Sequence, residues 1–170
     1  YWHLFYQGYP VEFPDKRIEG TNTRVHWGHA YSKDLINWKE LPYAIYPDPE
    51  ESCFSGATLV EDNRVIAMYH GTKVGNMIAI SNDPLLLNWD KLTGKPVIPI
   101  TKPDGSSWPY TVFDPCIWIK DGIYFALSGG TLPHEPTGRR TRANFLFKSK
   151  DLATWYYLHA FRAGDKFTLI

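Results

Sequence analysis

The sequence predicts an all-β protein and, within that class, a β-propeller of which about three blades are present. A motif of Ser, Asp and Trp recurs three times along the chain. β-Hairpin patterns precede the later copies, and no window carries a sustained helical period. A propeller blade is a four-stranded antiparallel sheet of roughly 40–50 residues. Each repeat therefore has the content of one blade.

The clearest hairpin pattern lies in the third repeat. Two apolar runs, Cys116–Ile119 and Ile123–Leu127, flank the stretch Lys120-Asp121-Gly122. Asp-Gly between β-branched and aromatic residues favours a tight turn, because such a turn needs residues that tolerate positive φ. Asp114 stands just before the first of these strands, and Pro115 favours an extended backbone there.

The earlier repeats follow the same order of strands. The segment Tyr1–Gln7 is predicted to be a strand of the first unit, and the second unit has a hairpin formed by Ala57–Val60 and Arg64–Tyr69. We therefore expect one partial propeller domain over residues 1–170, with the rest of a first blade over 1–50, a second blade over 51–109 and a third over 110–170. A β-sandwich of about seven strands is the alternative fold, but sandwiches do not repeat with this period.

The Ser, Asp and Trp motif is expected to form a turn at the end of a strand in each unit. The Ser and Asp side chains can bond to backbone amides, and the Trp can pack between neighbouring units. Its copies span Ser32 to Trp38, Ser81 to Trp89 and Ser149 to Trp155, and follow apolar strands at Gly28–Tyr31, Met77–Ile80 and Asn144–Lys148.

Composition narrows the range of partners. Lys and Arg total 18, as do Asp and Glu, so the net charge is zero and neither nucleic acid nor an anionic membrane is an expected partner. No apolar run approaches the ~20 residues of a membrane span. Cys53 and Cys116 do not form a metal-binding spacing, and we expect neither a metal nor a cofactor. The aromatic content of 16% suits a carbohydrate-binding surface, while the oligomeric state is left open.

The starts of two predicted strands are the candidate functional positions. In a propeller the first strand of each blade lies nearest the axis, so Phe54-Ser55-Gly56 and Phe113-Asp114-Pro115 would line the mouth of the central channel. A carboxylate in an aromatic hollow suits glycoside hydrolysis, because the oxocarbenium-like transition state is stabilised by nearby negative charge. Two further carboxyl groups would serve as nucleophile and proton donor.

Four motifs, in order along the chain, resemble glycoside hydrolase family 32, the family of invertases, inulinases and levanases. They are Leu4-Phe5-Tyr6-Gln7, the stretch from Trp27 to Leu35 followed by Trp38, Cys53-Phe54-Ser55-Gly56, and Phe113-Asp114-Pro115. The resemblance implies a five-bladed propeller and a retaining hydrolysis of fructofuranosides such as sucrose and fructans. It implies that Asp114 stabilises the transition state and that the substrate is bound by Gln7, Trp27, Phe54, Ser55 and Phe113.

The chain departs from the family pattern at two kinds of position. Phe113 stands where the family has Arg, and Ala57 stands where it has a second Ser. The nucleophile motif Asn-Asp-Pro-Asn-Gly and the acid/base motif Glu-Cys are expected before Tyr1 and after Ile170. The chain is thus expected to be an interior piece of a catalytic domain, inactive by itself.

Two alternatives stay open: another propeller glycosidase, acting on arabinosides or xylosides, and a carbohydrate-binding propeller without catalysis. An extracellular or periplasmic location is expected from the polymeric substrates of the family.

Other polar residues are expected to have structural roles. His29 should hydrogen-bond to a backbone partner rather than take part in chemistry, and His70 should have a structural role at the end of a strand. Glu50 and Glu51 are expected to be solvated acids ahead of a strand. The basic cluster Arg139, Arg140 and Arg142 is expected to be an exposed loop.

Overall fold

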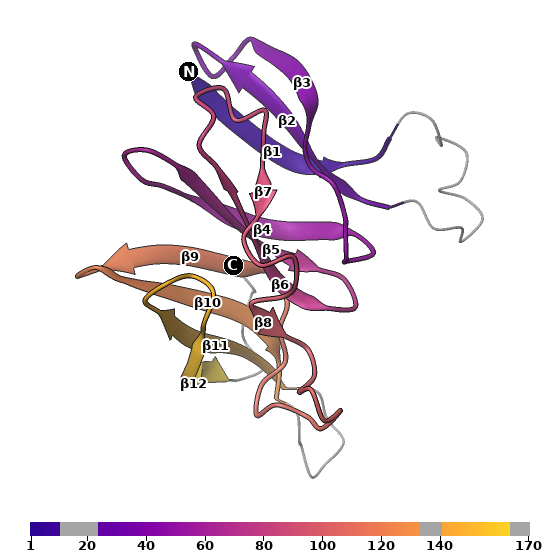
Figure 1. Ribbon diagram of the computed structural model, residues 1–170, viewed down its shortest axis with the longest axis vertical. Helices are drawn as coiled ribbons and strands as arrows, with labels where there is room; N and C mark the ends of the chain where they lie inside the picture. The colour runs from indigo at the N-terminus through magenta and orange to yellow at the C-terminus, as the bar shows by residue number, and fades with distance from the viewer. Residues whose placement is uncertain (11–23, 133–140, 164–170) are drawn as a thin grey trace.

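The computed structural model describes residues 1–10, 24–132 and 141–163. They form three antiparallel sheets that follow one another along the long axis of the molecule (Figure 1). No helix occurs in these described ranges. The prediction of an all-β chain is confirmed.

Each sheet is built from strands that are consecutive in the sequence. The first sheet has the order β1 (Trp2–Gly8), β2 (His26–Ser32), β3 (Trp38–Ile45). The second has the order β4 (Cys53–Val60), β5 (Val65–Gly71), β6 (Gly75–Ser81), β7 (Asp90–Lys91), with β8 (Ile98–Pro99) also paired to β6. The third contains β9 (Pro115–Lys120), β10 (Ile123–Thr131), β11 (Arg142–Ser149) and β12 (Tyr156–Ala163).

The tight turn predicted in the third unit joins β9 to β10. Asp121 and Gly122 both have positive φ, at 51° and 73°, and Lys120 pairs directly with Ile123. These are the backbone angles that an Asp-Gly pair adopts readily. The hairpin prediction is confirmed.

The Ser and Asp side chains hold the turns as expected. In the third copy, Ser149 Oγ accepts hydrogen bonds from the amides of Asp151 and Leu152 at 3.2 and 2.9 Å. The Asp151 carboxylate accepts from the amides of Ala153 and Thr154 at 3.0 and 2.7 Å. These bonds lower the pKa of Asp151, because they favour the ionised form.

A leucine in the left-handed backbone region marks every copy of this turn. Its carbonyl accepts a hydrogen bond from the Trp indole at 3.1, 2.8 and 2.6 Å in the three copies. The left-handed conformation is uncommon for a residue with a side chain, so its recurrence shows that the three units share one turn geometry. The leucines are Leu35, Leu86 and Leu152, with φ of 64°, 54° and 66°.

The second sheet is buried on both faces. Along β5, Ile66 and Met68 belong to the core shared with the third sheet, while Ala67 and Tyr69 belong to the core shared with the first. Alternate residues of a strand point to opposite faces, which accounts for a strand that is buried along nearly its whole length. Packing on both faces fixes the spacing of the three sheets, and so the relative positions of their strand ends.

Candidate active site

A β-bulge at the start of β4 places two of the predicted site residues. Cys53 pairs with Gly71 and Gly56 pairs with Tyr69, so Phe54 and Ser55 together lie opposite a single residue, His70. A bulge of this kind redirects side chains at the end of a sheet. A Cβ atom on Gly56 would lie 2.1 Å from the carbonyl oxygen of Met68, so the close approach of the two strands requires glycine here.

Gln7, Trp27 and Ser55 line one hollow between the first and second sheets, of about 350 Å³. The Gln7 side-chain amide donates to Ser55 Oγ at 2.9 Å, and Gln7 is the direct cross-strand partner of Trp27. The Trp27 indole donates to the carbonyl of Phe54 at 2.9 Å. Trp27 is only 5% exposed, so it both lines the hollow and belongs to the core.

Phe113 and Asp114 come just before β9 of the third sheet. They lie at the end of the second sheet that carries Phe54 and Ser55. The Phe113 ring stacks on the imidazole of His70 with ring centroids 4.6 Å apart, and the Phe54 ring lies 6.4 Å from that imidazole. Asp114 is half-buried. The two predicted strand entrances therefore meet at His70.

The electrostatics of His70 reflect this position. Burial lowers its pKa, while the hydrogen bond to Asn76 and the negative charge of Asp114 act in the opposite direction. Desolvation disfavours the charged form of an imidazole, and a nearby carboxylate favours it. Because burial is the largest effect, His70 is a neutral group beside the Asp114 carboxylate at neutral pH.

The backbone at Phe113 is held by a hydroxyl of the neighbouring strand. Ser128 Oγ lies 3.1 Å from the Phe113 amide nitrogen and 2.8 Å from the Phe113 carbonyl oxygen. The amide of Gly129 donates to the Asp114 carbonyl at 3.3 Å.

Sequence reasoning missed Asn76 and Ser128 because neither belongs to a recognised motif, and it assigned His70 only a place at the end of a strand.

Two structural expectations were wrong. Glu50 is fully buried, and its carboxylate accepts from Lys91 Nζ at 2.6 Å and from the Tyr69 hydroxyl at 2.8 Å. Glu51 is partly exposed and pairs with Lys73 at 3.0 Å. Only Glu51 is the solvated acid that the sequence suggested, since Lys91 lies far from Glu50 along the chain and could not be matched to it by pattern.

The second wrong expectation concerns His29. Its Nε2 lies 2.8 Å from Nδ1 of His3, so its partner is a side chain and not the backbone. Burial, followed by the neighbouring His3, lowers the pKa of His29 to about 4.

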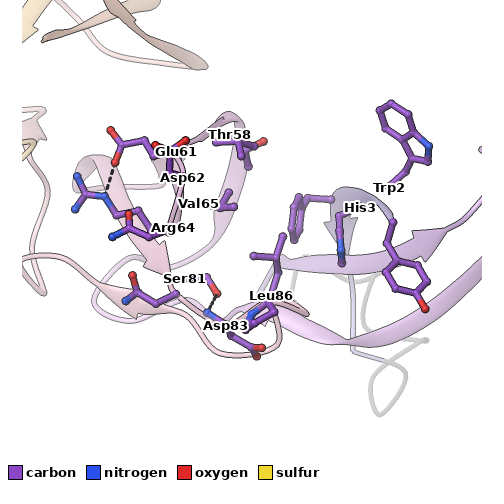
Figure 2. Close-up of a pocket in the computed structure, with 16 residues that line it drawn as sticks. Trp2, His3, Thr58, Glu61, Asp62, Arg64, Val65, Ser81, Asp83 and Leu86 are labelled. Atoms are coloured by element: carbon purple, nitrogen blue, oxygen red, sulfur yellow. Dashed lines mark hydrogen bonds and ion pairs between the residues drawn. The ribbon is translucent and has the colours of Figure 1, made fainter.

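A larger hollow of about 630 Å³ lies toward the opposite end of β1 (Figure 2). Trp2 and His3 line it from β1, and Arg64 and Asp83 line it from the segments just before β5 and just after β6 (Figure 2). It contains none of the predicted site residues. In the same region the Arg64 guanidinium forms an ion pair with Glu61.

Arg139 and Arg140 of the basic cluster lie outside the described residues, whereas Arg142 begins β11 and is exposed. In the part of the chain that the structure describes, no group of three His, Cys, Asp or Glu side chains is placed to hold a metal ion. Within the same part, no helix has the length and apolar character needed to cross a membrane.

The successive antiparallel sheets, with the predicted residues gathered at one end of them, define the class of the protein as a partial β-propeller. The sequence profile of the glycosyl hydrolases family 32 N-terminal domain matches residues 1–169. Because this match covers nearly the whole chain, the chain belongs to glycosyl hydrolase family 32.

Individual relatives agree with this assignment. A levanase of Bacillus subtilis (strain 168) is 38% identical over 112 residues, which are 58% of this chain and 15% of the levanase. An insoluble isoenzyme of β-fructofuranosidase from Arabidopsis thaliana is 32% identical over 170 residues, covering 91% of this chain and 28% of that protein. The chain therefore spans less than a third of the length of these relatives.

A solved structure supports the fold directly. The Bombyx mori family 32 β-fructofuranosidase superimposes with a TM-score of 0.68 at 29% identity, over 96% of this chain and 33% of the silkworm protein. The prediction of a propeller of this family is confirmed.

Proposed function

We propose that the protein containing this chain hydrolyses fructofuranosides with retention of configuration, and that Asp114 stabilises the transition state. The observation that carries the proposal is the position of Asp114. It lies half-buried beside His70, at the end of the sheets where the Phe54–Ser55 bulge and the Gln7–Ser55 hydrogen bond also lie. A fixed carboxylate at such a site favours the positive charge that develops on the sugar ring.

The polar side chains around the hollow support a carbohydrate substrate. Gln7 is exposed and Ser55 is partly exposed, and both offer hydrogen-bonding groups of the kind that recognise sugar hydroxyls. Trp27 contributes an apolar surface to the same hollow. The similar proteins are named levanase and β-fructofuranosidase, and the Bombyx mori enzyme is seen in complex with sucrose.

The catalytic roles in this mechanism are assigned from the family resemblance. The nucleophile and the proton donor are carboxyl groups of motifs that residues 1–170 do not contain in full. Asp114 forms no covalent bond to the sugar in this scheme. Its charge acts on the oxocarbenium-like transition state, so its contribution is felt mainly in kcat.

A related furanoside, such as an arabinoside, is a second candidate substrate. The observation that favours it is the stacking of Phe113 on His70, at the position where the family carries Arg. A phenyl ring provides no donor for a sugar hydroxyl, so the site favours a sugar with fewer hydroxyls to bind there.

The test is Asp114→Asn in the full-length parent enzyme, assayed for release of reducing sugar from sucrose, inulin, levan and an aryl arabinofuranoside. We expect kcat to fall at least about a hundredfold with little change in KM. Asp121→Asn, in the turn of the same hairpin, is the matched control and should leave both constants unchanged. Full activity in Asp114→Asn would contradict the role of Asp114, and sugar binding without any turnover by the wild type would favour a carbohydrate-binding propeller.

Two further proposals concern the whole protein. Residues 1–50 are the rest of a first blade, residues 51–109 a second blade and residues 110–170 a third, a division supported by the fact that every sheet lies within one of these ranges. An extracellular or periplasmic location is supported by the polymeric substrates that the proposed activity implies.

A further inference from the structure

We propose that Asn76 and Ser128 are positioning residues that, together with His70, fix the backbone of Phe113 and Asp114 and thereby the Asp114 carboxylate. The three side chains form a hydrogen-bonded chain that runs from the second sheet to the third. This inference rests on the proposed function of Asp114.

The chain of hydrogen bonds begins at His70 on β5 and passes from the second sheet to the third at Asn76. His70 Nδ1 lies 3.2 Å from Asn76 Oδ1, and Asn76 Nδ2 donates to Ser128 Oγ at 3.0 Å. Asn76 and Ser128 are both fully buried, and His70 is 4% exposed. Because an amide oxygen can only accept, the imidazole proton is assigned to Nδ1 of His70.

The Ser128 hydroxyl is saturated by these contacts. A hydroxyl has one proton to donate and two lone pairs to accept with. It accepts from Asn76 Nδ2 and from the Phe113 amide, and it donates to the Phe113 carbonyl, its shortest contact as a donor, at 2.8 Å. One side chain therefore holds both polar groups of the Phe113 backbone.

Phe113 needs such support because the backbone hydrogen bonds from β10 reach only as far as the Asp114 carbonyl, which accepts from Gly129. The pairing of β9 with β10 begins at Pro115, opposite Ser128, and proline has no amide hydrogen to donate. Ser128 thus provides for residue 113 the hydrogen bonds that a ladder would otherwise provide. Stacking of the Phe113 ring on His70 holds the same residue from the second sheet.

Loss of these hydrogen bonds should lower the rate of catalysis more than it weakens substrate binding. A small displacement of a catalytic group can cost up to about a hundredfold in rate. The predicted sugar contacts Gln7 and Ser55 belong to β1 and β4 and are not part of this hydrogen-bonded chain. Phe113 is held by it, but its ring provides no donor for a sugar hydroxyl. We therefore expect a lower kcat and an unchanged KM.

The first experiment compares Ser128→Ala with Ser149→Ala in the full-length parent enzyme. Both remove a buried hydroxyl that bonds to backbone amides, but Ser149 lies in a turn away from Asp114. We expect Ser128→Ala to lower kcat about tenfold with KM within twofold, and Ser149→Ala to lower only the melting temperature. Equal kcat values for the two variants would overturn the inference.

A double-mutant cycle with Asp114→Asn separates positioning from general destabilisation. If Ser128 acts through Asp114, Ser128→Ala should cause no further fall in the Asp114→Asn background, measured at high enzyme concentration over long incubation. An additive tenfold fall would overturn the inference and leave the role of Asp114 intact. Full activity in Asp114→Asn would overturn both.

His70→Phe provides a second route if Ser128→Ala does not fold. This variant keeps an aromatic ring for stacking on Phe113 and removes the hydrogen bond to Asn76. A several-fold fall in kcat with unchanged KM supports the inference, and an unchanged kcat contradicts it.

Discussion

The ring of Phe113 lies on the imidazole of His70, with the two planes inclined by 30° and the centroids 4.6 Å apart. Phe113 is 42% exposed and His70 is 4% exposed, so the phenyl ring lies on the solvent side of the imidazole. The contact joins the third sheet to the second beside Asp114. The position at which the family carries a cation is therefore occupied by an anchored apolar ring.

Phe113→Arg in the parent enzyme is expected to improve hydrolysis of fructosides. An arginine would bring fixed donors for sugar hydroxyls and a positive charge beside Asp114. A charge-assisted hydrogen bond of this kind should raise kcat/KM on sucrose about tenfold. Phe113→Leu, which removes the ring without adding donors, should not improve it. Efficient sucrose hydrolysis by the wild type, with Phe113→Arg neutral or harmful, would contradict this prediction.

Gln7 and Ser55 are expected to act as a pair in substrate binding. Gln7→Ala and Ser55→Ala should each raise KM several-fold, since each removes a polar group from the hollow. The double variant should be no worse than the more damaged single variant, because the two side chains hydrogen-bond to each other. Steady-state kinetics on sucrose gives the comparison, with Thr101→Ala as the control, because Thr101 is exposed and does not line the hollow. Unchanged KM in both single variants would show that the pair does not contact the sugar.

The two neighbouring ion pairs of the second sheet should differ sharply in their contribution to stability. Lys91→Met leaves the fully buried Glu50 carboxylate without its cation, and breaking a buried pair in this way costs about 3–5 kcal/mol of unfolding free energy. Lys73→Met removes the partner of the partly exposed Glu51, which should cost less than about 1 kcal/mol. Urea unfolding of the two variants measures the difference. Similar losses of unfolding free energy in the two variants would mean that burial does not decide how much each ion pair contributes to stability.

The Asp side chains of the repeated turns should make stability depend on pH at the acid end. Hydrogen bonds from the backbone of Thr154 lower the pKa of Asp151 in the folded state. When folding lowers the pKa of a carboxyl group, that group stabilises the folded state at pH values above its unfolded pKa of about 3.9. This contribution to stability is lost as the pH falls through the pKa of the folded state. Asp151→Asn should thus lower the melting temperature at pH 7, and the difference from wild type should shrink below pH 3.

Asp121→Asn is the control for this pH series, because Asp121 lies in the β9–β10 turn outside the repeated motif. Its melting temperature should follow that of the wild type across the pH range. A difference between Asp151→Asn and wild type that stays constant from pH 7 to pH 2 would contradict the electrostatic explanation.

The sequence alone determined the local features of this protein. Short apolar runs predicted the strands, and the Asp-Gly pair predicted the β9–β10 turn. The three Ser and Asp turns were predictable because each is closed by hydrogen bonds between residues at most five apart. The candidate positions Phe54, Ser55 and Asp114 could be proposed because they stand at strand starts within short motifs.

Only the tertiary structure decided which distant side chains meet. The Asn76–Ser128 hydrogen bond joins residues 52 apart, and the Lys91–Glu50 pair joins residues 41 apart. Such contacts depend on the spacing and register of whole sheets, which packing on both faces of the second sheet fixes. The bulge that sets Phe54 and Ser55 opposite His70 is likewise a property of strand pairing, because no single strand encodes which residue it will face.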